Sequence, residues 1–168
     1  MTLIVAGLVG NPRSGSKTLA AATSLVHKLA DTLGAQPGPI VDLADFGGRV
    51  LDYDDAELKA TRESLAGIRI LVVATPVYKG AYTGLLKSFL DGYGPGALEN
   101  TLTVPLTIAA SPAHSLAGAT HLQPVLDELG ALSPAGGIFI PDALSAVPSK
   151  RDEKFDSWID SRGAFLNV

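Results

Sequence analysis

The stretch LIVAGLVGNPRSGSKT, residues 3–18, joins a short apolar run to a loop of glycines, serines and basic residues. The run from Leu3 to Val9 is continuously apolar, which is typical of a strand buried on both faces of a parallel sheet. The segment that begins at Lys17 then carries apolar residues at helical spacing, and Gly34 predicts its end. A strand, a glycine-containing turn and a helix in this order predict the first unit of an α/β fold.

Strand patterns and helix patterns alternate along the rest of the chain. We predict further strands at residues 39–43, 68–74, 102–110 and 136–140, and further helices at residues 55–67, 84–92, 116–130 and 150–166. Asp54 is expected to cap the second helix. Pro105 inside a strand indicates an irregular ladder, and Pro124 predicts either a kink or a helix start. Five strands alternating with helices predict a three-layer, flavodoxin-like α/β sandwich with a parallel sheet of order 2-1-3-4-5.

Length and composition limit the class of protein. The 168 residues fit a single domain spanning residues 1–168. The formal net charge of −4 argues against nucleic acid or an anionic membrane as a partner. The absence of cysteine excludes thiolate catalysis, disulfides and zinc–thiolate sites, and it fits a cytoplasmic protein. No run reaches the roughly 18 apolar residues of a membrane helix, and we expect the N-terminal segment to be a strand rather than a signal peptide.

Two unusual loops follow the first and third predicted strands. In this fold the ligand crevice lies at the carboxyl ends of these strands, where the strand order reverses. The first loop is GNPRSGS, residues 10–16, and the second begins as TPVYKGAY, residues 75–82. Fold geometry and unusual sequence therefore predict a binding site at the same place.

The first loop is close to the triphosphate-binding motif G-x-x-x-x-G-K-[ST] but departs from it. Ser16 separates Gly15 from Lys17, whereas the motif places the lysine directly after the glycine so that it reaches the outer phosphates. The third strand ends without a carboxylate for a magnesium ion, and Asp42 is only a weak substitute. These departures argue against ATP- or GTP-dependent phosphoryl transfer, which we keep as an alternative.

The same loop still has the donors for an anion. Arg13 and Lys17 supply positive charge, and Ser14, Ser16 and Thr18 supply hydroxyl groups. The first amides of the following helix and its dipole favour an anion at the same point. This donor set predicts a terminal monophosphate bound without a metal. The alternative is that Ser16 only caps the helix while Arg13 and Lys17 are solvated.

The second loop offers flat and rigid apolar walls. Pro76, Val77, Tyr78 and Lys79 follow the third strand, and proline and tyrosine suit a flat ring at low entropic cost. Loop amides or the Lys79 ammonium are expected to stabilise negative charge on a reduced ring, or Lys79 contacts a cofactor phosphate. A second interpretation places Tyr78 and Tyr82 at a subunit interface, and the two interpretations are compatible.

The chain resembles a known family of flavoproteins. The segments GNPRSGSKT (residues 10–18), ATPVYKGAYTGLLKSFLD (74–91) and VPLTIAASPAHSLAGATHLQPVLDELGA (104–131) together resemble the NAD(P)H-dependent FMN reductases of the flavodoxin-like fold. The likeness is greatest to the reductases that supply alkanesulfonate-type monooxygenases. It covers about Leu3 to Pro141, and the stretch TPVYK-x-x-Y-[ST]-G-x-LK is its specific part.

This resemblance implies roles for individual residues. Arg13, Ser16 and Thr18 would hold the phosphate of FMN, and residues 76–79 would face its ring system. NADPH or NADH would be the second cofactor.

The loop after the fourth strand matches the family only in part. The family pattern is G-G-[ST]-x-x-H near the flavin, and Ser111 and His114 match it, whereas Ala109 and Ala110 replace its glycines. Some relatives also carry a bulged helix at a tetramer interface, around residues 118–123 of this chain.

The resemblance and the residues together predict a cytoplasmic NAD(P)H:FMN oxidoreductase that forms a homodimer or homotetramer. If FMN serves as a substrate, reduced FMN would leave for a monooxygenase or for oxygen. We name no residue for proton transfer and expect no metal site. The alternatives are a quinone, azo or chromate reductase with bound FMN, and a flavodoxin-like electron carrier. Arg13, Lys17 and the modest net charge argue against the carrier.

Overall fold

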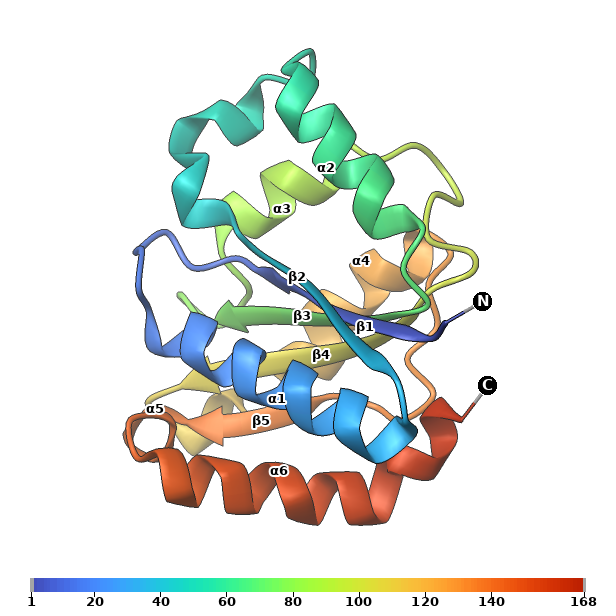
Figure 1. Cartoon of the computed structure of the whole chain (residues 1–168). Helices are drawn as coiled ribbons and strands as arrows, with labels where there is room; N and C mark the ends of the chain where they lie inside the picture. Colours follow the sequence, from blue (N-terminus) through green and yellow to red (C-terminus); the bar gives the residue numbers. More distant parts are fainter. Residues whose placement is uncertain (1, 168) are drawn as a thin grey trace.

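A five-stranded parallel sheet forms the centre of the computed structural model, which describes residues 2–167. Its strands are β1 (Ile4–Val9), β2 (Gln36–Asp42), β3 (Ile70–Pro76), β4 (Leu102–Ala109) and β5 (Ile138–Pro141). They lie in the order β2-β1-β3-β4-β5, and each neighbouring pair is parallel. The predicted flavodoxin-like architecture and strand order are confirmed (Figure 1).

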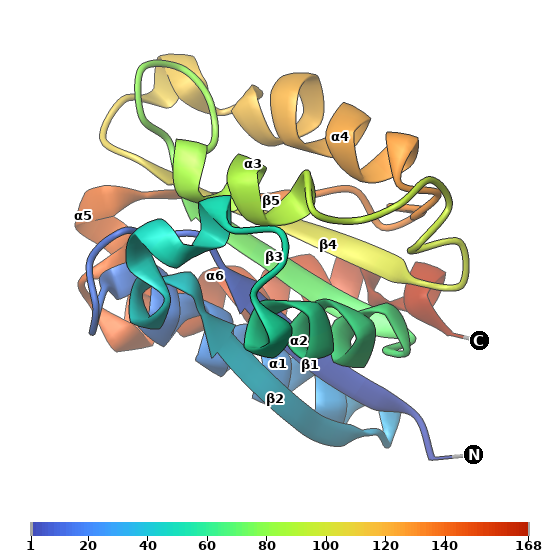
Figure 2. The ribbon, with the colours of Figure 1, turned by 90° about the horizontal axis from the view of Figure 1, so that it is seen from above.

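Helices cover both faces of this sheet (Figure 2). On one face lie α1 (Lys17–Leu33), α5 (Asp142–Ser145) and α6 (Pro148–Arg162); on the other lie α2 (Ala56–Ala66), α3 (Gly84–Leu90) and α4 (Gln123–Glu128). Shorter turns occur at Leu43–Asp45, Gly47–Leu51, Pro112–His114, Gly118–Leu122 and Gly163–Leu166. Within residues 2–167, no helix combines the length and apolar character needed to cross a membrane.

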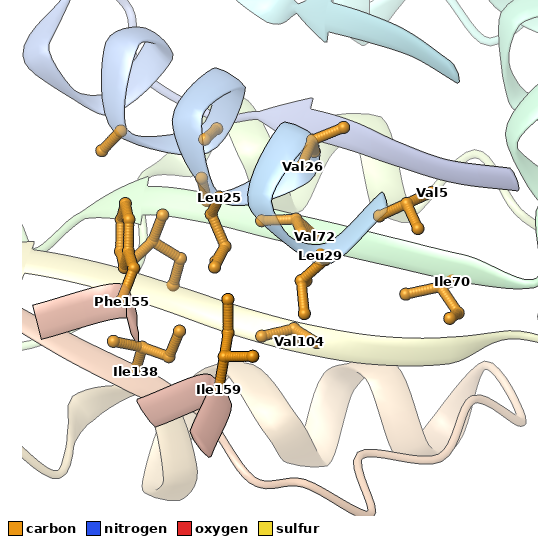
Figure 3. Packing of buried hydrophobic residues seen from close by; sticks show 14 of the residues in the cluster. Val5, Leu25, Val26, Leu29, Ile70, Val72, Val104, Ile138, Phe155 and Ile159 are labelled. Atoms are coloured by element: carbon orange, nitrogen blue, oxygen red, sulfur yellow. The ribbon is translucent and has the colours of Figure 1, made fainter. Parts of the chain in front are cut away.

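Two apolar layers hold the sheet between its helices. In the layer shown in Figure 3, valines and isoleucines of the sheet meet large side chains from two helices. These helical side chains are Leu25 and Leu29 of α1 and Phe155 and Ile159 of α6. Since the central strands are buried on both faces, they are mostly apolar, and the few polar residues in them, Thr75, Thr103 and Thr107, are buried as well.

Local signals fix both ends of α1. The Ser16 hydroxyl accepts a hydrogen bond from the Leu19 amide at 3.1 Å, so Ser16 is the N-cap. Gly34 ends the helix with a φ of 61°, which is in the left-handed region that glycine tolerates best. The start of α1 next to the first loop is therefore determined locally.

The predicted cap of α2 is wrong by one residue. Asp55, rather than Asp54, accepts hydrogen bonds from the amides of Glu57 at 3.0 Å and Leu58 at 3.1 Å. Asp54 lies one position earlier and instead pairs with Lys59 at 2.9 Å. An N-cap must reach the amides two and three positions ahead, and only Asp55 stands at that distance.

Strand boundaries differ from the prediction mainly at the sheet edge. β2 begins at Gln36 rather than Pro39, and Pro37 pairs with Val5 of β1. β2 is an edge strand, where a proline can be placed without loss of a ladder bond. β3 runs from Ile70 to Pro76, so it begins and ends two residues later than predicted.

The two prolines singled out in the sequence lie where their missing N–H groups are tolerated. Pro105 is opposite Val73 of β3, and pairing of β4 with β5 begins only at the next residue, Leu106. Pro124 lies in the first turn of α4, directly after the π-helical turn Gly118–Leu122. A helix start, rather than a kink inside one helix, is the outcome at Pro124.

Candidate functional site

A cleft of about 690 Å³ lies at the carboxyl ends of β1, β3 and β4. This is the expected position in a doubly wound sheet, where the strand order reverses. Residues from four segments line it: Asn11 and Arg13 to Thr18, Pro76 to Tyr78, Ile108 to Ala110, and Asp142. Eight of the eleven predicted site residues are among them, which are Arg13, Ser14, Ser16, Lys17, Thr18, Pro76, Val77 and Tyr78.

The first loop is braced by its own side chains. The side-chain Nδ2 of Asn11 donates to the Thr18 hydroxyl at 3.0 Å, and its side-chain Oδ1 accepts from the Arg13 backbone amide at 3.0 Å. Asn11 and Thr18 are both buried. Gly15 turns the chain with a φ of 62°, in the left-handed region. These bonds hold the loop in one shape across the start of α1.

This loop presents unpaired donors to the cleft. The backbone amides of Lys17 and Thr18 find no acceptor among residues 2–167, and they stand at the positive end of the α1 dipole. The Arg13 and Ser14 side chains are exposed beside them. Ser16 caps the helix, as the alternative interpretation expects, and it lines the cleft as well. The donor set suits a monophosphate anion.

Thr83 joins the first loop to α3. Its hydroxyl donates to the Gly10 carbonyl oxygen and accepts from the Leu86 amide at 3.2 Å, and its own amide donates to the Thr75 hydroxyl at 3.2 Å. A Cβ on Gly10 would stand 2.5 Å from Leu86 Cβ, so only glycine allows this close approach. The ends of β1 and β3 and the start of α3 are therefore tied together below the cleft.

The second loop forms an apolar wall of the cleft. The Val77 amide donates to the Ile108 carbonyl at 2.8 Å, and Tyr78 and Ala81 exchange two backbone hydrogen bonds at 2.8 and 3.2 Å. Tyr78 is 45% exposed, so its ring is open to a ligand. The backbone amides of Val77 and Tyr78 are therefore already hydrogen-bonded within the protein. The prediction that loop amides bind the polar edge of a ring thus does not apply to these two amides.

Three predicted residues lie outside the cleft lining. Lys79 stands at the tip of the Tyr78–Ala81 turn, with an exposed side chain and a φ of 54°. Ser111 caps a 3₁₀ turn through the Ala113 amide at 3.3 Å, and His114 ends that turn. Because this turn directs the chain away after β4, the loop borders the cleft through Ala109 and Ala110 instead.

The sequence analysis missed two residues that line the cleft with polar side chains, Asn11 and Asp142. Asn11 lies two residues after the end of β1, within the first loop, and this position is the signal that could have identified it. Asp142 follows β5, whose carboxyl end lies at the same sheet edge. Its carboxylate forms an ion pair with Lys17 at 3.0 Å. The part of the cleft at the start of α1 thus contains two cationic side chains, Arg13 and Lys17, and one carboxylate.

Asp42, the weak substitute for a magnesium ligand, has a structural role. Its carboxylate accepts from the Ala44 amide at 3.2 Å and caps the turn Leu43–Asp45. Burial raises the pKa of Asp42, while the Ala44 hydrogen bond opposes that change and the nearby Asp45 charge adds to it. Asp42 does not line the cleft, so the structure offers no support for phosphoryl transfer there.

Comparison with known proteins gives one consistent answer. A family model described as NADPH-dependent FMN reductase matches residues 3–143. The chain is 35% identical over 141 residues to an FMN reductase (NADPH) of Escherichia coli strain K12, which covers 81% of this chain and 72% of that protein. It is 30% identical over 150 residues to the NADH-dependent FMN reductase SfnE of Pseudomonas putida, covering 86% and 80%.

A solved structure agrees with these relatives. The apo form of an NADH:FMN oxidoreductase, EMOB, superposes with a TM-score of 0.82 at 29% identity. The match covers 96% of this chain and 90% of that one.

Proposed function

The chain belongs to the NADPH-dependent FMN reductase family, and from this premise we propose that its cleft at β1, β3 and β4 binds FMN for reduction by NAD(P)H. The protein is thus an oxidoreductase that uses a nicotinamide and FMN. The observation that supports the site assignment is that one cleft joins a loop rich in hydrogen-bond donors to an apolar wall. A volume of about 690 Å³ lies within the range usual for cofactor sites.

The phosphate end is proposed to lie at the start of α1. The unpaired amides of Lys17 and Thr18 and the exposed Arg13 guanidinium support this orientation. A guanidinium binds a phosphate through two parallel hydrogen bonds, which fixes both its place and its direction. The Asn11 bonds keep the loop preorganised, so little ordering entropy is lost when the anion binds.

The ring end is proposed to lie between the Pro76–Tyr78 wall and the Ile108–Ala110 edge. FMN supplies the hydride-accepting ring, and this chain's residues supply its position and its dry surroundings. Pro76 and Tyr78 offer rigid faces against which a flat ring can stack. Hydride transfer depends on distance and stacking, so no side chain is required as a general acid.

Delivery of reduced FMN to a monooxygenase is a further part of this proposal. It rests on the chain's likeness to SfnE, whose name describes an NADH-dependent FMN reductase. Names among the relatives include both NADPH and NADH, so we assign neither nicotinamide alone. If FMN remains with the protein through size-exclusion chromatography, it is a bound cofactor rather than a released product.

The activity is tested by NADH and NADPH oxidation with FMN, FAD, riboflavin or no flavin. We expect turnover with FMN, and the absence of turnover with every flavin would refute the assignment.

Arg13→Ala tests the proposed orientation of FMN in the cleft, because riboflavin lacks the phosphate. We expect the Kd for FMN to rise about tenfold or more, as for loss of a charged hydrogen bond, with the Kd for riboflavin nearly unchanged. Equal losses for both flavins would contradict the proposed orientation.

We also propose a single flavin-binding domain, a cytoplasmic location and a homodimer or homotetramer. An apolar cleft of about 420 Å³ between α3 and α4 and the exposed Leu51 and Leu116 support self-association. The π-helical turn at Gly118–Leu122 lies where some members of the family place a tetramer interface. Light scattering coupled to size-exclusion chromatography would give the number of subunits, and a monomer in solution would refute the proposed homodimer or homotetramer.

A further inference from the structure

An ion pair crosses the phosphate end of the cleft. Lys17 Nζ lies 3.0 Å from Asp142 Oδ2, and the two side chains are 50% and 48% exposed. Both residues line the cleft. The lysine counted among the phosphate donors is therefore already bonded to a carboxylate.

The fold brings these residues together from distant parts of the sequence. Lys17 begins α1, and Asp142 begins α5 directly after β5. Figures 1 and 2 both show α5 beside the first turn of α1. Because β5 ends at the same sheet edge as β1, β3 and β4, a residue just beyond it reaches the cleft.

We propose that Asp142 weakens the binding of the FMN phosphate by competing with it for Lys17. The proposal rests on the function assigned above, since it concerns the phosphate end of the same cleft. The Lys17 ammonium has three N–H donors and spends one of them on Asp142, whose carboxylate holds the ammonium beside α5 and offsets its positive charge. A phosphate dianion at the start of α1 therefore gains the full charge of Lys17 only when the pair with Asp142 opens. The Lys17–Asp142 pair is half-exposed, and such pairs are weak enough to exchange with another anion.

Weaker binding fits a protein that hands its flavin to another protein. In this proposal Arg13 and the α1 amides orient the phosphate, whereas a fully available Lys17 would slow its departure. Differences in affinity between variants of one site are mostly differences in dissociation rate. Asp142 is therefore a positioning residue that acts through Lys17 and favours release of FMN.

The test compares flavin binding to wild type and Asp142→Asn by quenching of flavin fluorescence. We expect Asp142→Asn to lower the Kd for FMN about fivefold, which corresponds to about 1 kcal/mol. The Kd for riboflavin should change less than about 1.5-fold, because riboflavin carries no phosphate. Inorganic phosphate should compete with FMN more strongly in the variant. An unchanged or higher Kd for FMN in Asp142→Asn would overturn the proposal.

Asp156→Asn is the matched control. Asp156 pairs with Lys28, another lysine of α1, at 2.6 Å, and neither residue lines the cleft. This variant makes the same change in net charge on the same face of the sheet. It should leave both flavin affinities unchanged. A fivefold gain for FMN in Asp156→Asn would assign the effect to overall charge and would refute the competition.

Three further variants separate competition from simple repulsion and from misfolding. In a Lys17→Ala background, Asp142→Asn should change the Kd for FMN less than about twofold, because there is no lysine to compete for. A full fivefold gain in that background would refute competition. Asp142→Glu, which keeps the carboxylate, should restore the wild-type ratio of FMN to riboflavin affinity, whereas Asp142→Ser should behave as Asp142→Asn does.

The outcomes also separate this inference from the proposed function. If wild type shows no preference for FMN over riboflavin, the phosphate assignment itself fails. If wild type prefers FMN but Asp142→Asn does not strengthen that preference, only the role of Asp142 fails.

Discussion

The Thr83 hydroxyl holds three parts of the site together, and its removal gives the most direct test of the structure. Thr83→Val keeps the side-chain shape but removes the N-cap of α3 from the Leu86 amide and the donor to the Gly10 carbonyl. Loss of an N-cap costs about 1 kcal/mol, and a buried polar group without a partner costs about 1–3 kcal/mol. Because Thr83 is 3% exposed, water does not replace the lost bonds without rearrangement. We therefore expect the free energy of unfolding to fall by about 2–4 kcal/mol.

Urea unfolding followed by circular dichroism measures this loss, and an unchanged m-value would show that the two states remain comparable. Thr83→Ser keeps the hydroxyl and should lose less than about 1 kcal/mol. Thr32→Val makes the same chemical change on the exposed side of α1 and should stay within about 0.5 kcal/mol of wild type. A loss below about 1 kcal/mol for Thr83→Val would refute the structural role assigned to this hydroxyl.

The other predictions concern the core and pH. Phe155→Ala should lower the free energy of unfolding by about 3–5 kcal/mol, since Phe155 is fully buried between α6 and the sheet; the same urea titration measures it, and a loss under about 2 kcal/mol would contradict this packing. The hydrogen bond from the Leu58 amide, and after it the one from the Arg49 side chain, lower the pKa of Asp55 below its ordinary value of 3.8. The charged Asp55 carboxylate therefore stabilises the fold at pH values above 3.8. This stabilisation is lost as the pH falls through the lower pKa of the folded state. Asp55→Asn keeps the N-cap but removes the charge, so its free energy of unfolding should be lower than that of wild type at neutral pH. This difference between variant and wild type should become smaller below about pH 4, and a larger difference there would contradict the prediction.

The sequence predicted the fold because its signals are local and repeated. Strands buried on both faces of a parallel sheet are mostly apolar along their length, and β1, β3 and β4 carry that pattern with only Thr75, Thr103 and Thr107 as polar exceptions. The start and the end of α1 are likewise each determined by one residue, the N-cap Ser16 and the C-cap Gly34. The sequence predicted strand ends less well where pairing with a neighbouring strand determines them. The edge strand β2 begins early because β1 pairs with it, although its first residues include Pro37 and Gly38.

The candidate site divides in the same way. Arg13 to Thr18 are neighbours in the chain and lie at a strand-to-helix turn, so their meeting in the cleft followed from the sequence pattern. The assignment of Lys79, Ser111 and His114 depended on how two loops turn, and those turns carry the three residues away from the cleft lining. The position of a side chain after such a turn depends on the hydrogen bonds that close the turn, and the spacing of residues in the sequence does not predict those bonds.

By itself, the sequence determined the layered α/β fold, the edge of the sheet that carries the candidate site and the hydrogen-bond donors of the first loop. Those properties follow from apolar periodicity and from donors that are adjacent in the chain. Only the tertiary structure decided that Lys17 meets Asp142, that Thr83 holds Gly10, and that Ala109 and Ala110 border the cleft in place of Ser111 and His114. These contacts join segments 73 and 125 residues apart, and such distances are closed by the order and register of the strands, not by any local preference of the chain.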